Sequence, residues 1–97
     1  MAQFDFYPFQ DGYLLDVQSA LMDRLNTRMS VPLLPFGRAP KPAERLNPVF
    51  TIGENRFVMV TQFMGAVPVA ELKEKAGSLA HEHFVIKSAL GMVFDGV

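Results

Sequence analysis

Short runs of the chain alternate hydrophobic and polar residues, which is the pattern of half-buried β-strands. This pattern predicts strands over residues 3–9 and 28–33. Residues 13–17 are rich in β-forming residues and are predicted to form the returning strand of a hairpin, and residues 49–52 and 57–63 flank a turn, which predicts a strand on each side of it. Asp11-Gly12 favours a tight hairpin turn after the first strand, because glycine tolerates positive φ. Residues 53–56 are predicted to form the turn of a second hairpin. Pro8 cannot donate to a strand ladder, so we expect it at a sheet edge or a strand end.

In two of these segments, the apolar positions also indicate which faces of the strand are covered. Residues 57–63 begin with apolar side chains on both faces, so we expect this strand in the centre of the sheet with both faces covered. In the strand over residues 28–33, Met29 lies on the apolar face. Prolines interrupt residues 34–48, which are predicted to be irregular, and Pro68 is expected to mark the end of a strand or of the sheet region.

Near Ser78 the period changes to between three and four, which indicates an amphipathic helix. The hydroxyl of Ser78 suits an N-cap, since it can accept a hydrogen bond from a free backbone N–H of the first turn. The predicted apolar stripe of this helix consists of Leu79, Ile86, Ala89, Leu90, Val93 and Phe94. Gly91 lies inside the helix, where glycine costs about 1 kcal/mol relative to alanine. The order of elements therefore predicts a mainly β fold of the α+β class with one C-terminal helix.

Composition narrows the classes of function. We expect the 97 residues to form a single domain (residues 1–97), and a chain of this size benefits from a partner subunit that covers more of its surface. A net charge of −1 argues against a protein whose main role is to bind nucleic-acid phosphates. The absence of cysteine excludes disulfides, thiol catalysis and cysteine zinc sites. We expect no signal peptide and no transmembrane span, and therefore a cytoplasmic protein with no membrane partner.

Side chains that could perform chemistry are few and scattered. His81 and His83 would point about 200° apart on a helix, so they could not chelate one metal ion from the same face. Arg28, with Thr27 and Ser30 beside it, could serve a metal-free ribonuclease, but a surface strand is the simpler interpretation. We expect no catalytic residues, no metal and no cofactor. An interaction protein is favoured over an enzyme.

Several strings of residues together resemble the CcdB family. They are Gln3-Phe4, Leu15-Asp16-Val17-Gln18-Ser19, Arg28-Met29, Val31-Pro32-Leu33, Pro48, Ile52-Gly53, Met64, Val67-Pro68-Val69, Leu79, Ile86-Lys87-Ser88-Ala89-Leu90 and Phe94-Asp95-Gly96-Val97. The strings follow the order of the family from one end of the chain to the other. The main difference is a shorter first hairpin, at residues 10–12.

The resemblance implies an SH3-like, mainly antiparallel β fold with a C-terminal helix, assembled as a homodimer. Members of this family are toxins of bacterial toxin–antitoxin pairs. They bind the A subunit of DNA gyrase and trap the enzyme while it is joined to cleaved DNA. A partly disordered, CcdA-like antitoxin neutralises the toxin. Operator DNA is bound through the antitoxin and only indirectly by the toxin, which suits the near-neutral charge of this chain.

The resemblance also implies a gyrase-binding surface. The residues at the matching positions are Leu21, Met22, Gly91, Asp95, Gly96 and Val97. Gly91 stands where the family has an asparagine, and Asp95 where it has a tryptophan that is thought to stack on an arginine of gyrase. A carboxylate cannot stack, but it can pair with a guanidinium. We therefore expect Asp95 to form an ion pair with gyrase, which makes binding more sensitive to salt.

Other interpretations of these residues and of the whole chain are open at this stage. Leu21 and Met22 could belong to the core, although two consecutive strand residues cannot both face one core. Most of the methionines, including Met22, Met59 and Met92, are expected to fill gaps in the core. One alternative function is a MazF-like endoribonuclease. Another is a degenerate CcdB-like member that binds the antitoxin without poisoning gyrase.

Overall fold

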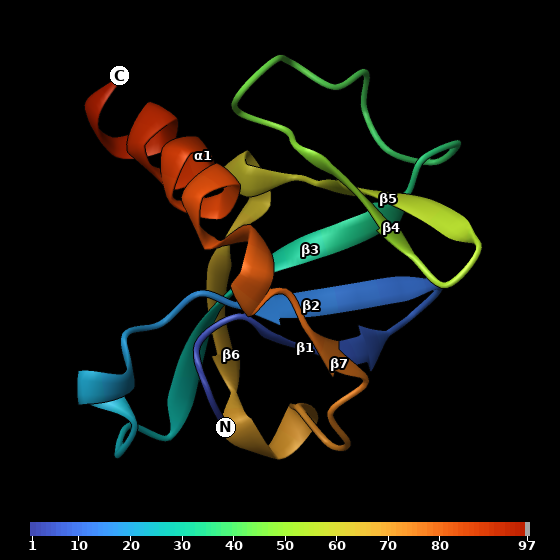
Figure 1. The fold of residues 1–97 in the computed structure, drawn as a ribbon. Helices are drawn as coiled ribbons and strands as arrows, with labels where there is room; N and C mark the ends of the chain where they lie inside the picture. Colours follow the sequence, from blue (N-terminus) through green and yellow to red (C-terminus); the bar gives the residue numbers. More distant parts are fainter. Residues whose placement is uncertain (97) are drawn as a thin grey trace.

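An antiparallel sheet curled into a half-barrel forms the framework of the computed structural model, which describes residues 1–96 (Figure 1). The strands are β1 (Asp5–Phe9), β2 (Gly12–Asp16), β3 (Thr27–Pro35), β4 (Val49–Ile52), β5 (Asn55–Met59), β6 (Gly65–Pro68) and β7 (Gly77–Ser78). They follow the order β4-β5-β3-β2-β1-β7, and β6 pairs with β3. One helix, α1 (His83–Asp95), lies against the sheet. The predicted α+β class, mainly antiparallel β with one C-terminal helix, is confirmed.

The long strand β3 pairs with three other strands. Its Ser30–Leu33 part pairs with β2, while on its other side β6 pairs with residues 27–30 and β5 pairs with residues 33–35. Pro32 lies between the last two pairings, so its missing N–H costs no ladder bond there. Its carbonyl oxygen accepts from the backbone N–H of Val60 at 3.0 Å.

The prediction of one strand over residues 57–63 is wrong in its length. β5 ends at Met59, and a 3₁₀ turn, η2 (Thr61–Phe63), carries the chain from one part of β3 to the other, where β6 begins. The expected central position is confirmed, because β5 lies between β4 and β3 and residues 57–60 are all buried. Pro68 ends β6, as predicted for a strand end. The sequence signal did not predict β6 or the short β7.

Two hydrophobic clusters fill the two faces of the sheet. The larger one consists of Phe4, Phe6, Leu15, Val17, Val31, Leu33, Phe50, Phe57, Met59, Leu79, Ile86 and Ala89. The smaller one, on the other face, consists of Tyr7, Leu14 and Leu72, with Val67 packed against it. Of the methionines expected in the core, Met59 is fully buried and Met92 is half-buried, but Met22 is exposed. Met29 is 38% exposed, because it lies near the end of β3, beyond the edge of the larger cluster.

The C-terminal helix begins later than predicted. Ser78 Oγ accepts from the backbone N–H of Ala80 at 3.1 Å, so it caps a 3₁₀ turn, η4 (Ala80–Glu82), that precedes α1. The predicted stripe is buried at Leu79, Ile86 and Ala89. Val93 and Phe94 of the predicted stripe are 39% and 71% exposed, so the sheet of the same protomer does not cover them.

The first hairpin is present, but glycine has a different role from the one predicted. The residue of the turn with positive φ is Gln10 (φ 54°), and Gly12 is not among the glycines with positive φ. A Cβ at Gly12 would lie 2.1 Å from the carbonyl oxygen of Leu33, so glycine is needed for the close approach of β2 to β3. Pro8 lies beyond the part of β1 that β7 pairs, which confirms its expected edge position.

The remaining differences concern the ends of elements. β1 begins at Asp5 rather than at residue 3, because Phe4 has a φ of 73°, outside the extended region. The second hairpin turn is two residues shorter than the predicted 53–56, since Ile52 already pairs with Asn55. Residues 36–48 form no helix or strand, as the prolines predicted.

Candidate functional site

Leu21 and Met22 lie on an exposed 3₁₀ turn, η1 (Ala20–Met22), that projects from the sheet between β2 and β3 (Figure 1). Leu21 is 94% exposed and Met22 is 53% exposed, so the alternative interpretation that placed them in the core is wrong. Ser19 starts the turn: its Oγ accepts from the backbone N–H of Leu21 at 3.2 Å, and its carbonyl oxygen accepts from Met22 N–H at 3.0 Å. Leu25, 48% exposed, extends this apolar surface, which the sequence did not indicate.

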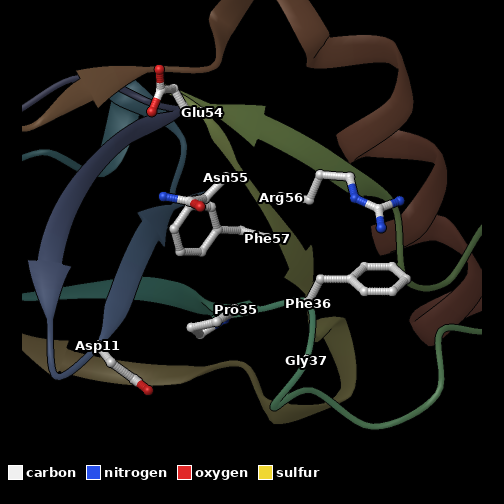
Figure 2. A pocket seen from close by; sticks show the side chains of 8 residues that line it. All are labelled: Asp11, Pro35, Phe36, Gly37, Glu54, Asn55, Arg56 and Phe57. Carbon is white, nitrogen blue, oxygen red and sulfur yellow. The ribbon is translucent and has the colours of Figure 1, made fainter.

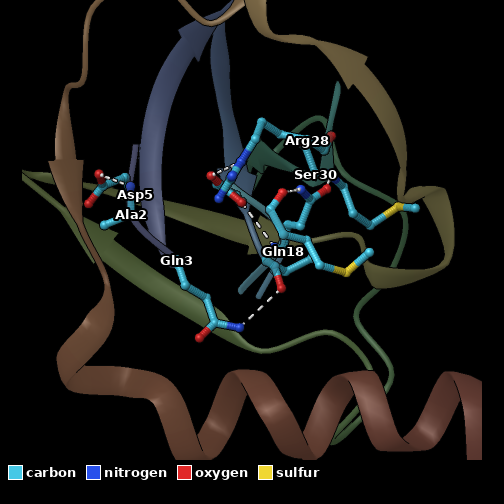
Figure 3. A network of polar contacts seen from close by, with 10 residues as sticks. Ala2, Gln3, Asp5, Gln18, Arg28 and Ser30 are labelled. Carbon is cyan, nitrogen blue, oxygen red and sulfur yellow. Dashed lines mark hydrogen bonds and ion pairs between the residues drawn. The ribbon is translucent and has the colours of Figure 1, made fainter. Parts of the chain in front are cut away.

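A polar network connects η1 to the interior of the protein (Figure 3). The Nε of Arg28 donates to Asp16 Oδ2 at 2.8 Å, and the backbone N–H of Gln18 donates to Asp16 Oδ1 at 2.9 Å. The side chain of Gln18 then donates through Nε2 to the carbonyl oxygen of Met22 at 2.7 Å. Its Oε1 accepts from the backbone N–H of Met29 at 2.9 Å. The exposed turn is therefore joined by hydrogen bonds to a buried ion pair.

The prediction of Arg28 on a surface strand is wrong, because both members of this ion pair are buried. Arg28 is 1% exposed and Asp16 is 0% exposed. Alternation along the strands places them on the same face as Tyr7 and Leu14, and β6 and Leu72 cover this face. Within residues 1–96, no acceptor lies within hydrogen-bond distance of Nη1 or Nη2 of Arg28.

Burial of this pair makes it sensitive to the loss of one partner. Desolvation of two ions offsets most of their attraction, whereas removal of one ion leaves an uncompensated buried charge. Arg28 is 1% exposed, so its guanidinium cannot contact a nucleic acid at the surface, which argues against the main basic candidate for ribonuclease chemistry.

Tyr7 lies near this ion pair, and its surroundings shift the pKa of its phenol. Burial is the main cause that raises the pKa of Tyr7 above its ordinary value, and the carboxylates of Asp5 and Asp16 raise it further. The positive charge of Arg28 lowers it in part. The net direction is upward, so the phenol keeps its proton more firmly in the folded protein.

The second part of the predicted surface is the C-terminal end of α1. Gly91 is half-buried and Asp95 is exposed on the last turn. Gly96 adopts the left-handed conformation, with φ 72° and ψ 13°, and its N–H donates to the carbonyl oxygens of Gly91 and Met92 at 3.1 and 3.2 Å. This is the usual glycine end of a helix. Gly96 thus has a structural role in the helix, and Val97 lies outside the described residues.

Phe94 lies beside this predicted surface. The sequence predicts it in the packing stripe of the helix, yet it is 71% exposed next to Asp95. At about 100° per residue, Phe94 lies about 80° from Ile86 around the helix axis, at the margin of the stripe. Val93 lies near the middle of the stripe, but the last turn of α1 projects beyond the sheet (Figure 1). A check of the angle of each stripe residue would have identified Phe94.

One protomer does not bring the two parts of the surface together. In Figure 1, η1 projects at one end of the sheet, below the helix, while the C-terminal end of α1 lies at the opposite end of the view. Leu21 and Met22 are therefore separate from Gly91, Asp95 and Gly96 in this chain.

Two hollows are lined by residues other than the predicted ones. A pocket of about 440 Å³ is lined by Asp11, Pro35, Phe36, Gly37, Glu54, Asn55, Arg56 and Phe57 (Figure 2). The guanidinium of Arg56 lies 4.1 Å from the centre of the Phe36 ring, and Arg38 pairs with Asp11 at the rim. A smaller hollow, about 270 Å³, is lined by Arg45, Phe84, Val85 and Ser88. The mixed charges of the first and the apolar walls of the second show no cluster of catalytic groups.

Among residues 1–96, no three His, Cys, Asp or Glu side chains lie together in a way that could hold a metal ion. His81 lies in η4 and His83 begins α1, where its Nδ1 contacts the carbonyl oxygen of Ala80 at 3.0 Å. In the same residues, no helix has both the length and the apolar character to cross a membrane.

Comparison with known families identifies a relationship over most of the chain. The model of the family described as CcdB protein matches residues 3–96 of this 97-residue chain. The match therefore includes the strand framework, η1 and the whole of α1.

Proposed function

Since this chain belongs to the CcdB family of toxins of toxin–antitoxin pairs, we propose that it binds the A subunit of DNA gyrase and traps the complex of gyrase with cleaved DNA. The observation that carries the proposal is the exposure of Leu21, 94%, on a turn whose backbone is fixed by hydrogen bonds. An exposed aliphatic side chain on an ordered turn is suited to a protein partner, because its burial there gains hydrophobic free energy. The net charge of −1 also suits a protein target better than nucleic acid.

The burial of Arg28 favours this proposal over ribonuclease activity. RNA cleavage would need a basic side chain at the surface to contact the phosphate, and Arg28 is 1% exposed and paired with Asp16. In the proposed mechanism, the target enzyme performs the chemistry. This protein only holds the cleaved state, so its own contribution is binding free energy.

We further propose a homodimer as the active form. The two parts of the gyrase-binding surface lie apart on one protomer, and a second copy would present both parts twice. Gyrase A is itself two-fold symmetric, so a two-fold dimer suits its target. A CcdA-like antitoxin would neutralise the dimer in the cytoplasm, and operator DNA would be bound through the antitoxin.

The test is a cleavage assay with purified protein, gyrase, ATP and supercoiled plasmid. We expect linear DNA after treatment with detergent and protease, and we expect Leu21→Ser to reduce its yield at least about tenfold, as for loss of a buried aliphatic anchor. Phe84→Ser is the matched control, since Phe84 is an 80% exposed apolar residue at the N-terminal end of α1, outside the proposed surface. No linear DNA with the wild-type protein would refute gyrase poisoning.

A degenerate member of the family is the second candidate. It is favoured by Gly91 and Asp95, which stand where the resemblance implies asparagine and tryptophan. This candidate predicts stable binding of a CcdA-like antitoxin with no linear DNA in the same assay. An RNA substrate, incubated in parallel without gyrase, tests the ribonuclease alternative.

A further inference from the structure

The side chain of Gln18 connects both ends of the segment that carries Leu21 and Met22. Its Nε2 donates to the carbonyl oxygen of Met22 at 2.7 Å, at the end of η1. Its Oε1 accepts from the backbone N–H of Met29 at 2.9 Å, on β3 after the segment has returned to the sheet. One carboxamide thus uses a donor and an acceptor to fix the turn against the strand (Figure 3).

Gln18 is itself held in place by buried groups. Its backbone N–H donates to Asp16 Oδ1 at 2.9 Å, and Asp16 is fully buried in its ion pair with Arg28. The preceding residue, Val17, donates its N–H to the carbonyl oxygen of Met29 at 2.9 Å. The carboxamide therefore extends from a rigid part of the sheet towards an exposed turn.

Little else holds η1 to the rest of the protein. Residues 19–26 are all exposed, and no residue of η1 is buried. Among residues 1–96, Ser19 makes hydrogen bonds only within the turn, and the carbonyl oxygen of Asn26 accepts from Val69 N–H at 2.9 Å at the far end of the segment. The bond from Gln18 to Met22 thus connects the middle of an exposed segment to the sheet. Without it, the turn would have to be ordered during binding, at a cost in conformational entropy.

We infer that Gln18 is a positioning residue, whose carboxamide fixes η1 so that Leu21 and Met22 meet the protein target in their bound arrangement. This inference rests on the proposed function, because gyrase A is the target in the test. Gln18 is half-buried behind the turn, so it acts through the residues it positions rather than by contact.

Both hydrogen-bonding groups of the carboxamide are required, which determines the variants. Gln18→Met keeps the length of the side chain and loses the donor and the acceptor. Gln18→Glu keeps an acceptor for Met29 N–H and loses only the donor to Met22. The control is Gln62→Met, since Gln62 is exposed and its Oε1 only accepts from Asn47 Nδ2, at 2.8 Å.

The experiment measures binding to purified gyrase A together with amide hydrogen exchange. We expect Gln18→Met to weaken binding about 5- to 30-fold and Gln18→Glu to weaken it by a similar factor. Amide exchange should become faster in η1 and stay unchanged at Val31 and Leu33 in the core. Gln62→Met should alter neither quantity. If Gln18→Met does not fold, Gln18→Glu provides the same comparison.

A double-mutant cycle separates positioning from a general loss of stability. If Gln18 acts by placing Leu21, the effect of Gln18→Met on binding should largely disappear in a Leu21→Ala background. Full additivity of the two changes would overturn the inference, and so would unchanged binding by both Gln18 variants while the wild-type protein binds. Failure of the wild-type protein to bind gyrase A would instead refute the proposed function, and the inference with it.

Discussion

The ion pair between Asp16 and Arg28 is the residue-level feature on which the candidate surface depends. It is fully enclosed, and it supports Gln18 through the second oxygen of the carboxylate. A buried pair is rarely a large net source of stability, because both ions are desolvated. Its role here is to fix a strand end in one position, from which the exposed turn begins.

This arrangement predicts unequal effects of single and double substitutions. Asp16→Asn keeps an acceptor for Gln18 N–H but leaves the charge of Arg28 buried and unpaired, so we expect a loss of about 3–5 kcal/mol in unfolding free energy. The double variant Asp16→Asn/Arg28→Met removes both charges, together with the two guanidinium nitrogens that lack acceptors in residues 1–96. It should therefore lose less unfolding free energy than Asp16→Asn alone. Urea unfolding measures both. A double variant that is less stable than Asp16→Asn would contradict this account.

The phenol of Tyr7 predicts how stability changes at alkaline pH. Its pKa is raised in the folded protein above the ordinary value of about 10, mainly by burial and then by Asp5 and Asp16. Above pH 10 the unfolded chain releases this proton first, so it binds fewer protons than the folded chain, and the unfolding free energy falls as the pH rises. The fall begins near pH 10 and ends once the folded-state pKa is passed.

Urea unfolding between pH 7 and pH 11 tests this expectation, with Tyr7→Phe as the variant that cannot ionise. The difference in unfolding free energy between the two proteins should be constant up to about pH 9. Above that pH, the wild-type protein should lose stability relative to Tyr7→Phe. Parallel curves throughout the range would show that Tyr7 does not contribute to the alkaline loss of stability.

Single residues show what the sequence could and could not predict. The sequence argument placed at most one of Leu21 and Met22 in the core, whereas both are exposed because they lie on a 3₁₀ turn and not on a strand. Burial of Arg28 did not follow, because it depends on β6, a strand that the sequence signal did not predict. The hydrogen bonds of the Gln18 side chain could not be predicted either, since the bond to Met29 joins residues that are distant in sequence and share no pattern.

At the scale of elements, local signals predicted what local physics determines. Strand β3 followed from alternation, and β2 and β4 followed from β-forming residues and the turns beside them. Pro8 and Pro68 lie at the edge and the strand end that their missing N–H favours. The errors come from tertiary contacts. Whether the last turn of α1 is buried depends on where the sheet ends. The interruption of the strand at η2 depends on the pairing of β3, because β5 and β6 pair with different parts of β3.

The C-terminal end of α1 predicts a specific effect of glycine substitution. Gly96 has a φ of 72°, where a Cβ costs about 1 kcal/mol or more, while no atom would obstruct a Cβ there. We expect Gly96→Ala to loosen the last turn, with faster amide exchange there and a loss of about 1 kcal/mol in unfolding free energy. Gly37→Ala is the matched control, because Gly37 has no positive φ and open space around it. Equal effects of the two substitutions would contradict the conformational explanation.

At the scale of the whole molecule, the two parts of the proposed surface differ in chemistry as well as in place. The η1 part is apolar, with Leu21, Met22 and Leu25 exposed. The α1 part combines the exposed ring of Phe94 with the carboxylate of Asp95. Salt screens the second kind of contact and has little effect on the first. Binding to gyrase should therefore separate into a component that is sensitive to salt and one that is not.

Asp95 is placed where it opposes the stability of the helix. A carboxylate on the last turn meets the negative end of the helix dipole, and within residues 1–96 Asp95 takes part in no ion pair that would offset this. Asp95→Asn should therefore leave the fold unchanged or stabilise it slightly, by at most about 1 kcal/mol. If the carboxylate pairs with an arginine of gyrase, the same substitution should weaken binding, and most strongly at low salt.

Gyrase cleavage assays with wild-type protein and Asp95→Asn, at several salt concentrations, measure this opposition between stability and binding. We expect the variant to poison gyrase less than wild type at low salt, and the difference to shrink as salt is added, because screening weakens only the ion pair. Glu54→Gln is the control for net charge, since Glu54 is exposed in the β4–β5 turn, far from α1. Equal poisoning by Asp95→Asn and wild type at low salt would rule out the ion pair, and contact with gyrase at this end of α1 would then depend on Phe94.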